Sequence, residues 1–193
     1  MRKRNLWAMA LVMICLFLAA SCSSDKEPAQ LAIKGVEDAL NAAKGEIAKF
    51  VPDQLKGLEA ALKGAKEKFE KKEYTEALSA VKDLPGKVKE AVAAAAAKKA
   101  ELTKGWDAMS AEMPKMVEGI KAKVEALSAA KKLPAGIDKA KLDGAKTGLD
   151  ELTKGWADAE GAFKGGNLSD ALAKANELKG KAGALLASLE PAK

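Results

Sequence analysis

The chain has no histidine, and its only arginines are Arg2 and Arg4. Histidine is the commonest general base and a frequent zinc ligand, so its absence argues against catalysis and metal binding. Arginine reads guanine and grips phosphate in a bidentate fork, so nucleic acid is not expected as a partner. The chain has two cysteines, Cys15 and Cys22. Only Cys22 would remain if the N-terminal segment is removed as a signal peptide. We therefore predict no catalytic residues, no metal site and no cofactor.

Long apolar runs are also missing, except near the N-terminus. Residues 6–20 form an unbroken apolar run of 15 residues that follows the basic residues Arg2, Lys3 and Arg4. This run is short for a membrane span, which needs about 20 residues. A basic start and a short apolar run are typical of a signal peptide, so residues 1–21 are predicted to be one.

The residues before Cys22 resemble the lipobox of bacterial lipoproteins. Ala19, Ala20 and Ser21 form a run of small residues directly before this cysteine, and Leu18 precedes them. In that family the cysteine thiol receives a diacylglyceryl group, the signal peptide is cut just before it, and the new amino terminus is acylated. The resemblance implies that Cys22 is the lipidation site. Ordinary secretory cleavage at the same bond is the alternative.

The resemblance also implies where the protein lies. Residues 22–27 would be a short lipid-anchored tether and residues 28–191 the body. Ser23 is similar to the residue found in lipoproteins of the outer membrane, because the retention signal of that family is aspartate at this position. We therefore expect the protein to be exported and anchored by its lipid to the outer membrane, facing the periplasm. Without residues 1–21, which hold three of the 33 basic and none of the 27 acidic side chains, the net charge falls from +6 to +3.

Apolar residues of the body recur at alternating spacings of three and four, which predicts an all-α protein with one narrow apolar seam on each helix. No stretch alternates with a period of two, so no sheet is expected. The first half of the body has the seams Ile33, Val36, Leu40, Ala43, Ile47, Phe50 and Leu55, Leu58, Leu62, Ala65, Phe69. The middle seam is Val88, Val92, Ala95, Leu102, Trp106, Met109, Met113, Met116, Ile120, with a gap at Lys99. The last two are Leu142, Ala145, Leu149, Leu152, Trp156, Ala159, Phe163 and Leu168, Ala171, Ala175, Leu178, Ala182, Leu185, Leu189.

Proline and glycine mark the ends of these helices. We expect turns at Val51–Pro52, near Lys72–Glu73, at residues 133–136 and at Gly165–Gly166, with Asn167 capping the last helix. Pro85 is expected to kink the helix that begins near residue 74. Pro114 leaves two possibilities, a long helix that continues through it or a new helix capped by Ser110. A continuous helix favours an elongated pair of three-helix units, and a break favours a compact antiparallel bundle.

The chain matches itself in two ways. A shift of 94 residues superimposes the seam from Leu55 to Phe69 on the part of a later seam from Leu149 to Phe163. The match continues into the following helix. This predicts a helical hairpin present twice, at about 51–97 and 145–191. The segment Glu101–Trp106 also matches Glu151–Trp156 at a shift of 50, which allows either a third copy or convergence.

The junctions of the two hairpins resemble the turn of tetratricopeptide repeats. The likeness covers about seven residues, Lys72–Leu78 and Gly166–Leu172. It implies helix-turn-helix packing and favours a protein-binding role.

Trp106, Met109, Met113 and Met116 form the candidate interaction patch, although core packing is the more common role for such residues. The leading hypothesis is a non-catalytic structural or protein-interaction module that binds another envelope protein. A lipid-anchored hydrolase with a carboxylate pair and a carrier of a hydrophobic ligand in a helical cavity are the alternatives. A third alternative is attachment to peptidoglycan through Lys193, since the abundant lipoprotein that ties the outer membrane to the wall is also an alanine-rich helical coil with a terminal lysine.

Overall fold

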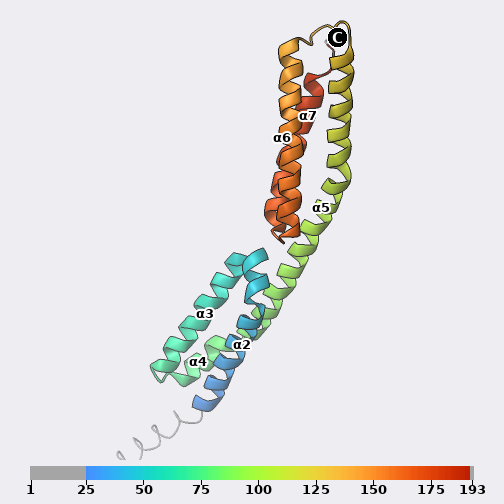
Figure 1. Ribbon diagram of the computed structural model, residues 1–193. Helices are drawn as coiled ribbons and strands as arrows, with labels where there is room; N and C mark the ends of the chain where they lie inside the picture. The colour runs from blue at the N-terminus through green and yellow to red at the C-terminus, as the bar shows by residue number, and fades with distance from the viewer. Residues whose placement is uncertain (1–24, 192–193) are drawn as a thin grey trace, which may run out of the picture. The chain divides into compact units, whose positions relative to one another are not determined.

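The computed structural model describes residues 25–191, and every regular element within that range is a helix. The all-α fold is therefore confirmed (Figure 1). The helices are α2 (Lys26–Phe50), α3 (Pro52–Glu70), α4 (Tyr74–Val81), α5 (Leu84–Ala129), α6 (Lys139–Lys164) and α7 (Leu168–Ser188). They form two compact units whose boundary falls inside α5, between Lys98 and Lys99.

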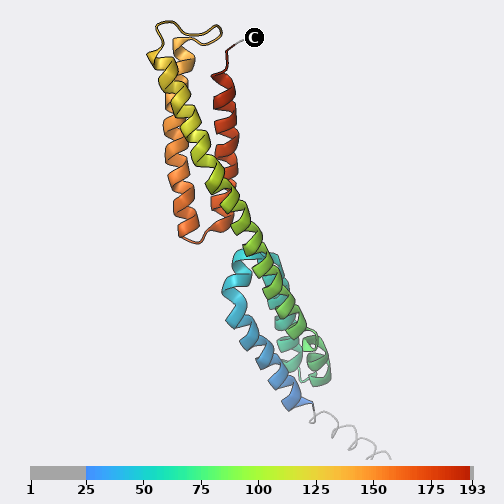
Figure 2. The ribbon, with the colours of Figure 1, turned by 90° about the vertical axis from the view of Figure 1, so that its right-hand side faces the viewer.

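The first unit contains α2, α3, α4 and the first part of α5. Its long helices alternate in direction along the chain, as Figures 1 and 2 show. Apolar side chains from all four helices meet in one core: Ala29, Ile33, Val36, Leu40, Ile47, Leu55, Leu58, Leu62, Ala65, Ala77, Val81, Leu84, Val88 and Ala91. The unit is a three-helix bundle in which α4 and α5 together supply the third helix.

The second unit contains the remainder of α5 with α6 and α7, again alternating in direction (Figure 2). Its core is Trp106, Met113, Ile120, Val124, Leu142, Ala145, Leu152, Trp156, Ala159, Ala171, Ala175, Leu178, Ala182 and Leu189. The described residues thus fold as two three-helix units.

The helix α5 decides between the two possibilities left open at Pro114. It runs for 46 residues with Pro114 in its interior, so no new helix begins at Ser110. The expected kink at Pro85 takes the form of a break, because α4 ends at Val81 and α5 begins at Leu84. Pro85 lacks the N–H that the Val81 carbonyl would need in a continuous helix.

The seam of α5 differs from the prediction in one place. Ala91 is 1% exposed whereas Val92 is 41% exposed, so the core residue between Val88 and Ala95 is Ala91. The spacing permits either residue, and the smaller one faces the core. The gap that the sequence shows at Lys99 coincides with the boundary between the two units.

The first helix begins earlier than the sequence suggested. The range 22–27 was expected to be a tether, but α2 already includes Lys26 and Glu27. The Ala29 N–H donates to the Asp25 carbonyl at 2.9 Å, and Thr75 Oγ1 of α4 donates to the Asp25 carboxylate at 2.8 Å. These two bonds fix the start of α2 within its unit.

The turns α3–α4 and α6–α7 have the same hydrogen bonds at a shift of 94 residues. In the first, the Lys72 N–H donates to the Phe69 carbonyl at 3.0 Å and the Glu73 N–H to the Lys68 carbonyl at 3.0 Å. In the second, Gly166 donates to Phe163 and Asn167 to Ala162, both at 2.8 Å. Both sets follow the Schellman pattern of a helix C-terminus. Asn167 occupies the N-cap position of α7, but its side chain makes no capping hydrogen bond, contrary to expectation.

Lys72 and Gly166 occupy equivalent positions with a left-handed backbone, at φ angles of 65° and 78°. Glycine adopts this conformation without a steric penalty, whereas a lysine is strained there. We expect Gly166→Lys to lower the free energy of unfolding by about 1 kcal/mol and Lys72→Gly to raise it by up to about 1 kcal/mol. Urea denaturation followed by circular dichroism measures both. Changes of the same sign at the two positions would contradict this explanation.

The first helices of the two units also share a spacing. The residues that face the core of α2 are Ala29, Ile33, Val36, Leu40, Ala43 and Ile47, and those of the second unit's part of α5 are Leu102, Trp106, Met109, Met113, Met116 and Ile120. The second series follows the first at a constant shift of 73 residues. Trp106 therefore corresponds to Ile33, and at a shift of 94 Trp156 corresponds to Leu62. The two tryptophans hold different places in the unit, so the match at a shift of 50 is not a third copy.

Candidate functional site

The predicted interaction patch lies in the interior of the second unit. Trp106 is 5% exposed and Met113 is fully buried, while Met109 and Met116 are half-buried against the same core. A partner could reach only the edges of the two half-buried methionines. The structure therefore gives these four residues a packing role, and the patch does not form an exposed surface.

Trp106 is the centre of an aromatic stack. Its ring lies 5.2 Å from the Trp156 ring with 3° between their planes, and 4.6 Å from the Phe163 ring with 9° between planes. Both partners belong to α6, which runs antiparallel to α5. The two matching segments 101–106 and 151–156 thus bring their tryptophans against each other. Stacked rings of this kind stabilise a core beyond their buried area.

Two residues that the sequence singled out, Cys22 and Lys193, lie outside the described residues. The lipidation site and the proposed wall attachment are therefore still predictions. None of the helices among residues 25–191 is long and apolar enough to cross a bilayer.

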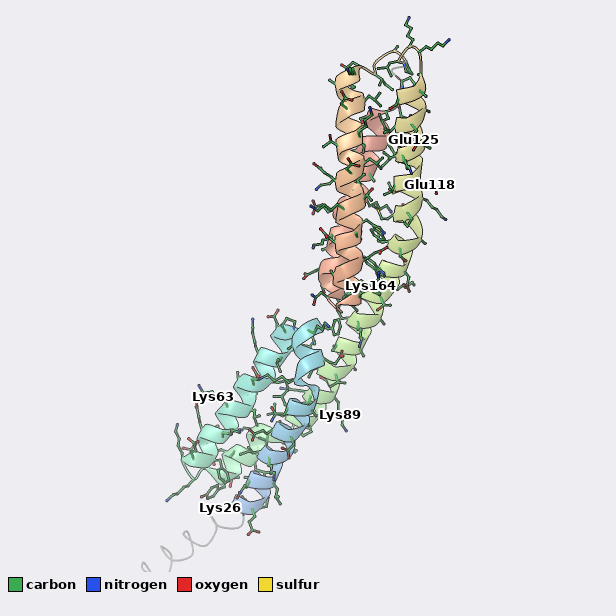
Figure 3. The ribbon with its side chains drawn as sticks, in the orientation of Figure 1. Lys26, Lys63, Lys89, Glu118, Glu125 and Lys164 are labelled. Atoms are coloured by element: carbon green, nitrogen blue, oxygen red, sulfur yellow. The ribbon has the colours of Figure 1, made fainter. Side chains whose placement is uncertain are left out.

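Charged side chains of the described residues are all at the surface, and every buried side chain there is apolar. Figure 3 shows Lys63, Lys89 and Glu118 pointing away from their helices into solvent. Within residues 25–191 no group of three or more acidic or cysteine side chains is placed to hold a metal ion. Ion pairs link neighbouring helices, for example Lys66 of α3 with Glu37 of α2 at 2.7 Å.

The surface of the first unit has an open groove of about 550 Å³ between α3 and α5, which we call the α3/α5 groove. Leu58 and Leu84, 6% and 2% exposed, form its floor. No residue of α2 contributes to it. The residues that line it are Gln54, Gly57, Leu58, Ala61, Leu84, Lys87, Glu90, Ala91 and Ala94.

The second unit has an open groove of about 380 Å³ between α6 and α7, the α6/α7 groove. Leu152 and Leu178, 2% and 8% exposed, form its floor. A Cβ at Gly155 would lie 2.7 Å from Leu178 Cδ2, so glycine lets this leucine pack directly on α6. The residues that line the groove are Gly148, Glu151, Leu152, Leu178, Lys181, Ala184, Leu185 and Ser188.

The two grooves occupy equivalent positions in the two units. Subtracting 94 from each residue number of the α6/α7 groove gives a residue of the α3/α5 groove, without exception. Both floors are a pair of leucines, Leu58 with Leu84 and Leu152 with Leu178. The only charged residue type that both share at one position is lysine, at Lys87 and Lys181. The glutamates, in contrast, lie at positions that do not correspond, Glu90 and Glu151.

No family of proteins, curated protein or solved structure matches this chain.

The lysine of the α6/α7 groove is held by its neighbours. Lys181 Nζ lies 2.6 Å from Glu177 Oε1, one turn earlier on α7. The hydrogen bond from Lys181 and its positive charge lower the pKa of the Glu177 carboxyl, and the same contact raises the pKa of Lys181. A general acid at neutral pH needs a raised carboxyl pKa, so the lowered pKa of Glu177 does not suit that role.

Sequence reasoning missed both grooves. The self-match at a shift of 94 was visible, but a groove depends on the small residues beside the seam, such as Gly57 and Ala94 in the first unit. The hairpin junctions are helix-turn-helix connections, and residues 25–191 show no further likeness to tetratricopeptide repeats. The signal that could have found the site was the repetition of two leucines and a lysine in both copies.

Proposed function

We propose that this protein is a lipid-anchored, non-catalytic interaction module of the bacterial envelope, held at the outer membrane and facing the periplasm. The observation that carries the interaction role is the recurrence of one open, apolar-floored groove in both units. Grooves of this kind between helices are used to bind protein helices. The membrane part of the proposal rests on the resemblance of Ala19–Cys22 to a lipobox.

The interaction role is tested by crosslinking in intact cells. A photoreactive amino acid at Ala184, which lines the α6/α7 groove, should crosslink a defined envelope protein. The same amino acid at Ala173, an exposed residue of the same helix that does not line the groove, is the matched control. Absence of a specific protein crosslink from both positions, and from further exposed positions on both units, would count against an interaction module.

The lipid anchor is tested at Cys22. We expect Cys22→Ala to abolish labelling by an alkyne-tagged fatty acid and to leave uncleaved precursor or unanchored protein. Cys15→Ala is the matched control, because that cysteine lies in the segment expected to be removed, and it should be labelled as strongly as the wild type. Labelled Cys22→Ala protein would show that the anchor is elsewhere.

A further inference from the structure

We propose that the α3/α5 and α6/α7 grooves each bind one amphipathic helix of a partner protein, with an acidic side chain of that helix beside Lys87 or Lys181. The inference rests on the proposed function and names the partner's chemistry. It assigns two equivalent sites to one chain, each lined by residues of a single unit.

The shape of the grooves fits a helix better than a lipid chain. Neither groove is an enclosed cavity, whereas a carrier must enclose an apolar ligand to keep it from water. The α5 wall runs from Leu84 to Ala94, which is about 15 Å at 1.5 Å per residue. That length accepts about three turns of a helix, with apolar side chains at successive seam positions.

The residues of the walls allow the close approach that helix packing needs. Helix axes in contact lie about 8–10 Å apart, and small residues at the contact permit the shorter distances. Gly57 has no atom within 4 Å of where its Cβ would be, so its side of the α3/α5 groove is open space. Gly148, Ala184 and Ser188 line the other groove. Large apolar side chains of an incoming helix would meet Leu58 and Leu84, or Leu152 and Leu178, on the floor.

The lysines of the two grooves indicate which charge the partner helix carries beside its apolar face. Lysine is the charged residue type found at the same position in both grooves, so a partner that fits both must offer a negative charge there. In the α3/α5 groove the Lys87 ammonium has no ion pair among the described residues. Lys181 forms an ion pair with Glu177 and also interacts electrostatically with Glu151, which lines the same groove. Its side chain is 60% exposed, so a further carboxylate can reach its ammonium. An acidic flank beside an apolar face is therefore the shared requirement.

The probe is a capped synthetic helix of about 18 residues, long enough to be helical when bound. It carries three leucines spaced four and three residues apart, glutamates beside them, and alanine and glutamine elsewhere. One control peptide has the same composition with the leucines spread around the helix, and another has lysine in place of glutamate. Isothermal titration of residues 23–193, which contain all the described helices, should give two peptides bound per protein and much weaker binding of both controls.

Blocking each groove separately gives the decisive test. Ala94→Trp and Ser188→Trp place a bulky ring at equivalent positions of the two grooves, so each should reduce the stoichiometry from two to one, and the double variant to zero. Ala93→Trp and Ala187→Trp are the matched controls, since these exposed neighbours do not line the grooves, and they should still bind two. Glu90→Trp and Ala184→Trp are a second equivalent pair if a first variant fails to fold.

Reversing the lysines tests the acidic flank. Lys87→Glu with Lys181→Glu should weaken the glutamate peptide on the order of threefold at each site and strengthen the lysine peptide. If the tryptophan variants still bind two peptides per chain, the assignment of the sites to the grooves is wrong. Saturation of the two sites by oleate but not by the peptide would also overturn the proposal and would instead identify an amphiphile carrier. Either result leaves the interaction module to be judged by crosslinking in cells, so the two failures are distinguishable.

Discussion

Trp106→Ala should lower the free energy of unfolding by about 3–5 kcal/mol. Its ring is 5% exposed and packs between Trp156 and Phe163 with nearly parallel planes. Truncation removes both stacking contacts and leaves a cavity in the core of the second unit. Urea denaturation followed by far-ultraviolet circular dichroism is the suitable measurement, because the substitution itself changes the tryptophan fluorescence.

The control for this prediction is Leu31→Ala. Leu31 is 70% exposed, so its truncation should change the free energy of unfolding by no more than about 0.5 kcal/mol. A double-mutant cycle with Phe163→Ala should show coupling of about 0.5–1.5 kcal/mol between the two rings. A loss of less than 1 kcal/mol for Trp106→Ala would mean that this stack does not organise the core.

Pro114→Ala should raise the free energy of unfolding by about 2 kcal/mol. Proline in a helix interior costs about 3 kcal/mol relative to alanine, because it lacks the N–H that the Ser110 carbonyl would accept and its ring meets the preceding turn. Part of the gain is offset by about 0.4–1 kcal/mol, since alanine makes the unfolded chain more flexible. Pro114 is exposed, so the smaller side chain leaves no cavity. Thermal denaturation should show a higher midpoint.

Pro52→Ala is the matched control for Pro114→Ala. Pro52 begins α3, where its missing N–H has no intrahelical partner in any case. This substitution should give no gain in stability, or a small loss. Equal gains at the two positions would show that helix position does not explain the effect.

The sequence predicted the helices and most turns because the 3.5-residue period and the positions of proline and glycine act locally. It could not decide the course of the chain at Pro114. The local cost of proline opposes the burial of Met113, Ile120 and Val124 along one helix face, and only packing against α6 and α7 determines which effect is larger. The same limit explains Val92, since a period permits two adjacent apolar residues and tertiary packing selects Ala91.

The candidate site was less predictable than the fold. The tryptophan and methionines were recognised as apolar, but apolar residues serve a core and a binding surface equally well on a sequence pattern alone. Burial of Trp106 and Met113 identifies the first role. The grooves depend on what is missing beside the seams, and a missing side chain leaves no periodic signal. The sequence analysis also did not identify Asp138, which follows the turn expected at residues 133–136 and caps α6 by accepting a hydrogen bond from the Lys141 N–H at 2.7 Å.

Because α5 is continuous, the two units cannot be separated into fragments without cutting a helix. No loop separates the two units, because their boundary between Lys98 and Lys99 lies within a single helix. A fragment that ends there has four carbonyl groups at its new end without hydrogen-bond partners, and the complementary fragment has four such N–H groups. A protease that needs an extended segment would find its substrate in residues 130–138, between α5 and α6, rather than at the boundary. Limited digestion should therefore sever the second unit internally before it releases either unit whole.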